Sequence, residues 1–74
     1  MHQEKHIQAF KRLGENIKRL REERGVTAKE LSEAVHMPLK TLLDVESGKV
    51  TRVFNARHLI GVCDFFRVEP KDIF

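Results

Sequence analysis

The sequence has only one cysteine among its 74 residues, Cys63, so no disulfide can form within one chain. The fold therefore does not need an oxidising compartment. The sequence also has no stretch near the roughly 20 apolar residues that span a bilayer, and no apolar run accompanies its charged N-terminus. These absences argue against a disulfide-rich secreted domain and a membrane protein, and they favour a cytoplasmic protein.

Motifs for catalysis and metal binding are missing as well. There is no Gly-rich phosphate loop and no nucleophile motif, and the histidines lack zinc-finger spacing with the lone cysteine. His2 and His6 could lie one helical turn apart and hold an adventitious metal ion, but a frayed polar tail over residues 1–6 is the better interpretation. The other two histidines are His36 and His58. We therefore expect no enzymatic activity, no metal, no cofactor and no small-molecule ligand.

The length and charge of the chain limit both its core and its partners. A chain of 74 residues forms a single domain and buries only roughly 60 to 65% of its unfolded surface, so its core must be compact or shared with a partner. The 14 Lys and Arg against 11 Asp and Glu give a net charge of +3. A modest positive charge makes an acidic surface such as phosphate a plausible partner.

Apolar residues at spacings of three and four predict a first helix from Ile7 onward, because that period places them on one helical face. The series is Ile7, Phe10, Leu13, Ile17 and Leu20. Arg24 and Gly25 then favour the helix end, since a cation suits the negative helix terminus and glycine accepts the left-handed conformation. The sequence predicts an amphipathic helix that ends near residue 24.

Residues 26–49 predict two short helices joined by a tight turn. Thr27 and Glu30 have the spacing of a capping box, in which each side chain satisfies a backbone N–H at the start of a helix. Pro38 ends this second helix, because it disfavours helical geometry at the residue before it, and it suits the start of the next. The third helix is expected over residues 38–47, with Leu42 and Val45 facing inward and Gly48 as its stop signal.

The rest of the chain predicts one more helix and a final turn. Residues 49–54 form a loop, for which a short two-stranded alternative remains open. Asn55 can cap the fourth helix, and Glu69 and Pro70 can open a last helical turn. The inward side of the fourth helix would consist of Leu59, Val62, Cys63 and Phe66. The sequence therefore predicts an all-α, compact bundle of about five short helices with a central helix-turn-helix.

Three segments carry a resemblance to a known family. They are LGENIKRLREERGVTAKELS (13–32), LLDVESGK (42–49) and FFRVEPKDIF (65–74). Together they resemble the lambda-repressor-like, Xre/Cro family of helix-turn-helix proteins. The resemblance implies a five-helix globule whose third helix enters the major groove, sequence-specific binding of double-stranded DNA in transcription regulation, and a dimer. It also implies a structural ion pair between Arg21 and Glu46.

The resemblance also suggests which residues touch DNA, although the third helix is unusually apolar where the family has glutamine, serine, arginine or asparagine. The expected base contacts are Leu39, Lys40, Leu43 and Asp44. The two leucines suit thymine methyl groups, Lys40 suits a guanine edge or a phosphate, and Asp44 suits a cytosine amino group. The expected contacts to the DNA backbone are Thr27, Lys29, Lys49, Arg52 and Arg57. Alternatively, Leu39 belongs partly to the core and Asp44 is merely solvated.

Two further hypotheses follow from apolar residues. Leu39 and Leu43 lie four positions apart, so they could instead anchor a protein-interaction module on the same fold that has lost DNA specificity. Near the C-terminus there are more apolar residues than so small a globule can bury, which predicts a two-fold homodimer. The expected dimer interface consists of Ile60, Phe65, Ile73 and Phe74.

Overall fold

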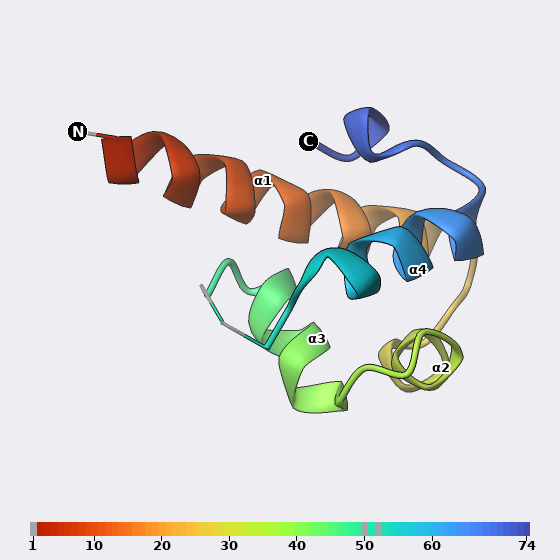
Figure 1. Ribbon diagram of the computed structural model, residues 1–74. Helices are drawn as coiled ribbons and strands as arrows, with labels where there is room; N and C mark the ends of the chain where they lie inside the picture. Colours follow the sequence, from red (N-terminus) through yellow and green to blue (C-terminus); the bar gives the residue numbers. More distant parts are fainter. Residues whose placement is uncertain (1, 50, 52) are drawn as a thin grey trace.

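The computed structural model describes residues 2–49, 51 and 53–74, and it describes side chains from Gln8 onward (Figure 1). The described part of the chain is all-helical, as predicted, and contains no strand. Its elements are α1 (His2–Glu23), α2 (Ala28–Ala34), α3 (Leu39–Glu46), α4 (Ala56–Phe66) and the 3₁₀ turn η1 (Pro70–Asp72). The fifth expected helix is thus a single 3₁₀ turn of three residues.

Helix α1 begins earlier than its apolar spacing predicts. It starts at His2, so residues 2–6, for which the sequence predicts a frayed tail, are helical. From Phe10 onward the apolar spacing marks the part of α1 that packs on the core. Residues 2–13 contain no proline or glycine that would break the helix earlier. In Figure 1 the first turns of α1 accordingly extend beyond the other helices.

The short helices begin and end at their expected signals. The Thr27 hydroxyl accepts a hydrogen bond from the Glu30 N–H at 3.0 Å, and the Glu30 carboxylate accepts one from the Thr27 N–H at 3.1 Å, so the capping box is confirmed. Pro38 is the N-cap of α3, which is one residue shorter at each end than predicted. Asn55 caps α4 as predicted, and its side chain accepts a hydrogen bond from the His58 N–H at 3.2 Å.

Helices α1 and α3 pack closely because residue 14 has no side chain. A Cβ atom at Gly14 would lie 1.8 Å from the carbonyl oxygen of Val45. Because backbone rather than a flexible side chain occupies that space, any larger residue would force the two helices apart. Gly14 therefore sets the distance between α1 and α3, and α3 is the helix that presents the candidate site.

The core collects the inward faces of all four helices and the last turn. Its fully buried side chains are Leu13, Ile17, Leu31, Leu42, Val45, Val62, Phe66 and Ile73. The burial of Ile73 corrects its assignment to a dimer interface, since it has no surface left for a partner. The Asn16 side chain donates a hydrogen bond to the Ile73 carbonyl at 2.8 Å, which holds the C-terminal segment against α1.

None of the described helices is long and apolar enough to cross a membrane.

Candidate nucleic-acid interface

The turn between α2 and α3 depends on a left-handed residue. His36 has φ 56°, and the N–H of Met37 donates a hydrogen bond to the Ser32 carbonyl at 2.8 Å. Histidine is among the residues that adopt positive φ more readily than most, so His36 can occupy this position of the turn. Met37 is buried behind the turn. The result is two short helices packed together on the lower side of the view in Figure 1, with α1 and α4 above them.

Helix α3 has a buried and an outer face. The buried face consists of Thr41, Leu42, Val45 and Glu46. The other four helical positions form what we call the α3 outer face: Leu39, Lys40, Leu43 and Asp44. Leu39 is 40% exposed and Leu43 is 49% exposed, Lys40 is exposed and Asp44 is partly exposed. The structure thus brings all four predicted base-contact residues onto one surface, and Leu39 is not part of the core.

An ion pair ties the end of α3 to α1. The guanidinium of Arg21 donates to both carboxylate oxygens of Glu46, at 2.8 and 2.9 Å, and also to the carbonyl of Val26 at 3.0 Å. The two side chains are 13% and 5% exposed. The hydrogen bond to Glu46 raises the pKa of Arg21 above its ordinary value. The pair therefore links α3 to α1 and to the residue before the α2 cap.

The last turn of α3 is also held by its own backbone. The Asp44 carbonyl accepts hydrogen bonds from the Ser47 hydroxyl at 2.8 Å and from the Lys49 N–H at 2.9 Å. The Ser47 N–H bonds the Leu43 carbonyl at 3.0 Å. Leu43 and Asp44 therefore project from a well-anchored stretch of backbone.

Sequence reasoning missed one residue beside the α3 outer face. Ser47, the C-cap of α3, is exposed. It lies three residues after Asp44 and four after Leu43, so the helical period alone could have assigned it to this face.

The residues expected to contact the DNA backbone lie on three elements. Thr27 and Lys29 stand at the start of α2, Lys49 follows α3, and Arg57 is in the first turn of α4. All four are exposed. Arg52, the fifth, lies outside the described residues. The described four are thus accessible to a ligand.

The segment that carries the α3 outer face is slightly positive. Over residues 38–49 the charged side chains are Lys40, Asp44, Glu46 and Lys49. Glu46 is neutralised by Arg21, which leaves two exposed lysines against one carboxylate. Within the described residues no cation lies within ion-pair distance of Asp44. Asp44 can therefore accept hydrogen bonds from a ligand.

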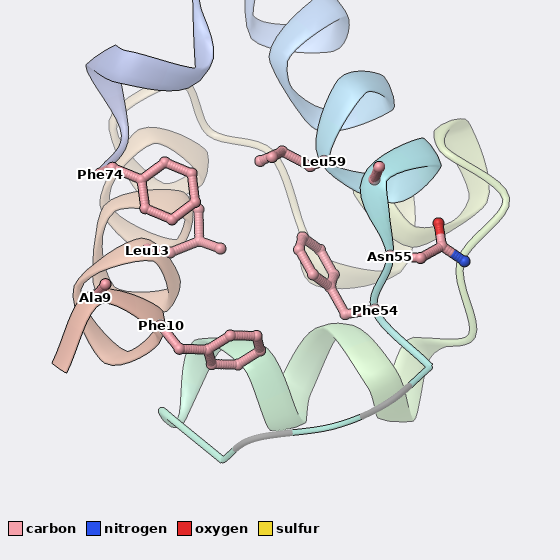
Figure 2. A pocket seen from close by; sticks show the side chains of 8 residues that line it. Ala9, Phe10, Leu13, Phe54, Asn55, Leu59 and Phe74 are labelled. Carbon is pink, nitrogen blue, oxygen red and sulfur yellow. The ribbon is translucent and has the colours of Figure 1, made fainter. Parts of the chain in front are cut away.

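A second feature is an apolar cavity of about 360 Å³ between α1, the start of α4 with the segment before it, and the C-terminus (Figure 2). It is lined by Ala9, Phe10, Leu13, Phe54, Asn55, Ala56, Leu59 and Phe74. The rings of Phe10 and Phe54 pack edge to face there, with their centroids 6.0 Å apart. It contains no titratable side chain, so it offers no acid–base chemistry. In the described part of the chain, no cluster of His, Cys, Asp and Glu could hold a metal ion.

Comparisons with known proteins identify relatives of this architecture. The model of the Cro/C1-type HTH DNA-binding domain family matches residues 16–74. The chain is also similar to the crystal structure of the clp gene regulator ClgR from Corynebacterium glutamicum, with a TM-score of 0.78 and 26% sequence identity. That similarity covers 88% of this chain and 67% of the ClgR chain. A search of curated proteins found no match.

Proposed function

The chain belongs to the family of Cro/C1-type helix-turn-helix DNA-binding domains, and we propose that it is a sequence-specific regulator of transcription that inserts α3 into the major groove of duplex DNA. This family is one of DNA-binding domains rather than enzymes. The observation that carries the proposal is the α3 outer face, four exposed or partly exposed side chains on a helix clamped by the Arg21–Glu46 pair. The likeness to a gene regulator supports the regulatory role.

In this proposal the α3 outer face reads base edges. Leu39 and Leu43 contact thymine methyl groups, Lys40 donates to the acceptors of guanine or to a phosphate, and Asp44 accepts from a cytosine amino group. Such contacts specify sequence because each base pair presents its own pattern of donors, acceptors and methyl groups in the major groove.

Polar and basic groups outside the α3 outer face hold the domain on the DNA backbone in this proposal. Phosphate contacts fix the register of a protein on the duplex without carrying sequence information themselves. The residues proposed for this role are Thr27, Lys29, Lys49, Arg52 and Arg57. Binding through them would weaken as salt rises, because each neutralised phosphate releases condensed counterions.

Binding to duplex DNA at several salt concentrations tests this division of roles. Lys40→Ala should reduce the ratio of the affinity for a selected site to the affinity for random DNA. Lys49→Ala should weaken binding to both equally and lower the slope of log affinity against log salt by about one. The two are a matched pair of exposed lysines, Lys40 in the first turn of α3 and Lys49 three residues after its end. If both changes reduce binding to selected and random DNA in the same proportion, the proposed division is wrong.

We further propose that the domain works as a two-fold homodimer. Ile60, Phe65 and Phe74 are 56%, 41% and 49% exposed, although all three are large and apolar. A dimer that covers them would remove this apolar surface from water and place two α3 helices one DNA turn apart, roughly 34 to 36 Å. Sedimentation should then show dimers at micromolar concentration, and Ile60→Lys should produce monomers. A wild-type chain that stays monomeric at high micromolar concentration would contradict the dimer.

A protein-interaction module is the second candidate, and it is favoured by the exposure of Leu39 and Leu43. In that case the α3 outer face would dock on an apolar groove of another protein. The positive balance of Lys40 and Lys49 over Asp44 favours DNA instead. The salt titration separates the candidates, because a protein-docking module would bind duplex DNA weakly and without sequence preference.

A further inference from the structure

We infer that the α3 outer face prefers a C·G pair whose cytosine carries a 5-methyl group, which Leu43 and Asp44 recognise together. This inference rests on the proposed function, since it requires α3 to lie in the major groove, and it assigns to Leu43 the methyl group of 5-methylcytosine in place of the thymine methyl group named there. It adds a property that sequence-specific binding alone does not include, namely sensitivity to the methylation state of the DNA.

The chemistry of base edges selects this target by elimination. A carboxylate can only accept hydrogen bonds, and the base edges in the major groove offer two donors, the amino groups of cytosine and adenine. The adenine amino group lies between two acceptors, its own N7 and O4 of the paired thymine, both of which repel a carboxylate. The cytosine amino group has only one acceptor beside it, O6 of the paired guanine, and has the C5 position on its other side. Asp44 therefore favours cytosine.

Leu43 offers an apolar contact surface, for which unmodified cytosine has no methyl group. Its side chain is 49% exposed, so half of its surface remains available for an apolar contact. Thymine offers a methyl group, but beside it stands O4, an acceptor that opposes the Asp44 carboxylate. Unmodified cytosine offers the amino donor without the methyl group. A 5-methylcytosine offers both on adjacent ring positions.

The placement of the two residues allows both contacts on one base. Leu43 and Asp44 are consecutive, so their Cα atoms are about 3.8 Å apart, and both belong to the α3 outer face. Lys40 lies one turn before Asp44 on the same face, where it can donate to the guanine of the same or the next pair. The α3 outer face thus holds an acceptor for cytosine, an apolar contact for its methyl group and a donor for guanine.

Reading one methyl group also requires a helix that does not shift, and α3 is most firmly held where these residues lie. Val45 packs with its carbonyl directly over Gly14, and Glu46 is paired with Arg21. The carbonyls of Leu43 and Asp44 accept the hydrogen bonds from Ser47 and Lys49. Leu43 and Asp44 are therefore preorganised, so little binding free energy is lost in ordering them.

Two parallel selections with the full chain test the inference. One random duplex library carries ordinary cytosine, and the other is synthesised with 5-methylcytosine throughout. Individual duplexes from each selection are then compared in methylated and unmethylated form by fluorescence anisotropy at one salt concentration. The variants are Leu43→Ala, which removes the apolar contact, and Leu43→Met, which keeps an apolar side chain of similar volume.

We expect cytosine to be enriched at one position of the site in the methylated library above its level in the ordinary one. At that position methylation should tighten binding about fourfold, the factor that burying one methyl-sized group gives. Leu43→Met should keep this preference, whereas in Leu43→Ala the ratio of the affinities for the methylated and unmethylated duplexes should fall to about one. Equal affinity for methylated and unmethylated duplexes at every C·G pair, or a preference that survives in Leu43→Ala, would overturn the inference.

The same selections distinguish this failure from failure of the proposed function. If the wild-type chain enriches a sequence from both libraries but shows no methylation preference, only the inference is wrong. If it enriches nothing from either library, the proposed DNA-binding function is wrong and the inference falls with it.

Discussion

Truncating Glu46 to alanine should destabilise the fold much more than truncating an exposed glutamate. The Glu46 carboxylate accepts two hydrogen bonds from Arg21, and the two side chains are only 5% and 13% exposed. In Glu46→Ala the guanidinium keeps its bond to the Val26 carbonyl at 3.0 Å but loses its counterion. A cation is then left uncompensated where water reaches it poorly, which is the costly outcome of breaking a buried pair.

The structure limits the size of this effect. Removing one partner of a fully buried pair costs about 3–5 kcal/mol, and the remaining exposure of Arg21 and its bond to Val26 reduce that figure to about 2–3 kcal/mol. A domain of 74 residues has a free energy of unfolding of roughly 4–11 kcal/mol in total. At roughly 4–8 °C per kcal/mol for a domain of this size, the melting temperature should fall by about 8–24 °C.

Thermal melting followed by far-UV circular dichroism measures the loss. The matched control is Glu23→Ala, an exposed glutamate at the end of α1, which should change stability by no more than about 0.5 kcal/mol. Glu22 is a poorer control because its charge also acts on Arg21. The double variant Arg21→Met/Glu46→Leu should recover much of the lost stability, since no unpaired charge remains. Equal melting temperatures for Glu46→Ala and Glu23→Ala would refute the reasoning.

Three further predictions concern packing, pH and the buried thiol. Gly14→Ala should lower the free energy of unfolding in urea by about 3 kcal/mol, because its Cβ would lie 1.8 Å from the carbonyl oxygen of Val45 in α3. In the control Gly61→Ala the new Cβ would lie 3.3 Å from the Val35 side chain, and the free energy should change by no more than about 1 kcal/mol. The hydrogen bond from the Thr27 N–H lowers the pKa of Glu30 below its ordinary value of 4.5, so the ionised carboxylate stabilises the fold fully above pH 4.5 and loses this effect as the pH falls through the lowered pKa. The difference in free energy of unfolding between wild type and Glu30→Gln should therefore shrink on acidification below pH 4.5, and a constant difference would contradict this. Burial raises the pKa of the Cys63 thiol, so a thiol reagent should label it far more slowly in the folded chain than in urea, and equal rates would contradict the packing.

The features that could be predicted from sequence are those encoded within a few consecutive residues. Thr27 and Glu30 form their capping box within one turn, and Asn55 caps α4 in the same way. The outer and buried faces of α3 also follow from the helical period, which assigned Leu42 and Val45 to the core. These signals do not depend on how the helices later pack.

The features that escaped prediction depend on contacts between distant parts of the chain. Ile73 rather than Phe74 is buried at the C-terminus, and its carbonyl accepts a hydrogen bond from Asn16, 57 residues earlier, a contact that no local pattern reports. His58 is buried and completes the α4 capping box by accepting the Asn55 N–H at its Nδ1, at 3.4 Å. Capping boxes are ordinarily recognised by glutamate or glutamine at that position, so the histidine gave no signal.

The candidate site also has one part that local sequence predicts and one part that depends on distant contacts. The periodicity of α3 was sufficient to group Leu39, Lys40, Leu43 and Asp44 on one face, because this grouping is a property of the helix alone. The anchoring of that face depends on Gly14 and on the Arg21–Glu46 pair, which join α3 to a helix more than twenty residues earlier. The family resemblance indicated the ion pair, while the spacing of apolar residues did not.

Methylation interference on a selected DNA site tests most directly whether α3 lies in the major groove. A single alkylating reagent methylates guanine at N7 in the major groove and adenine at N3 in the minor groove, so both grooves are probed in one experiment. We predict that N7-methylguanine within the site blocks binding of the wild-type chain, whereas N3-methyladenine in the same pairs does not. Interference from the minor groove alone, or from neither groove, would contradict the placement of α3.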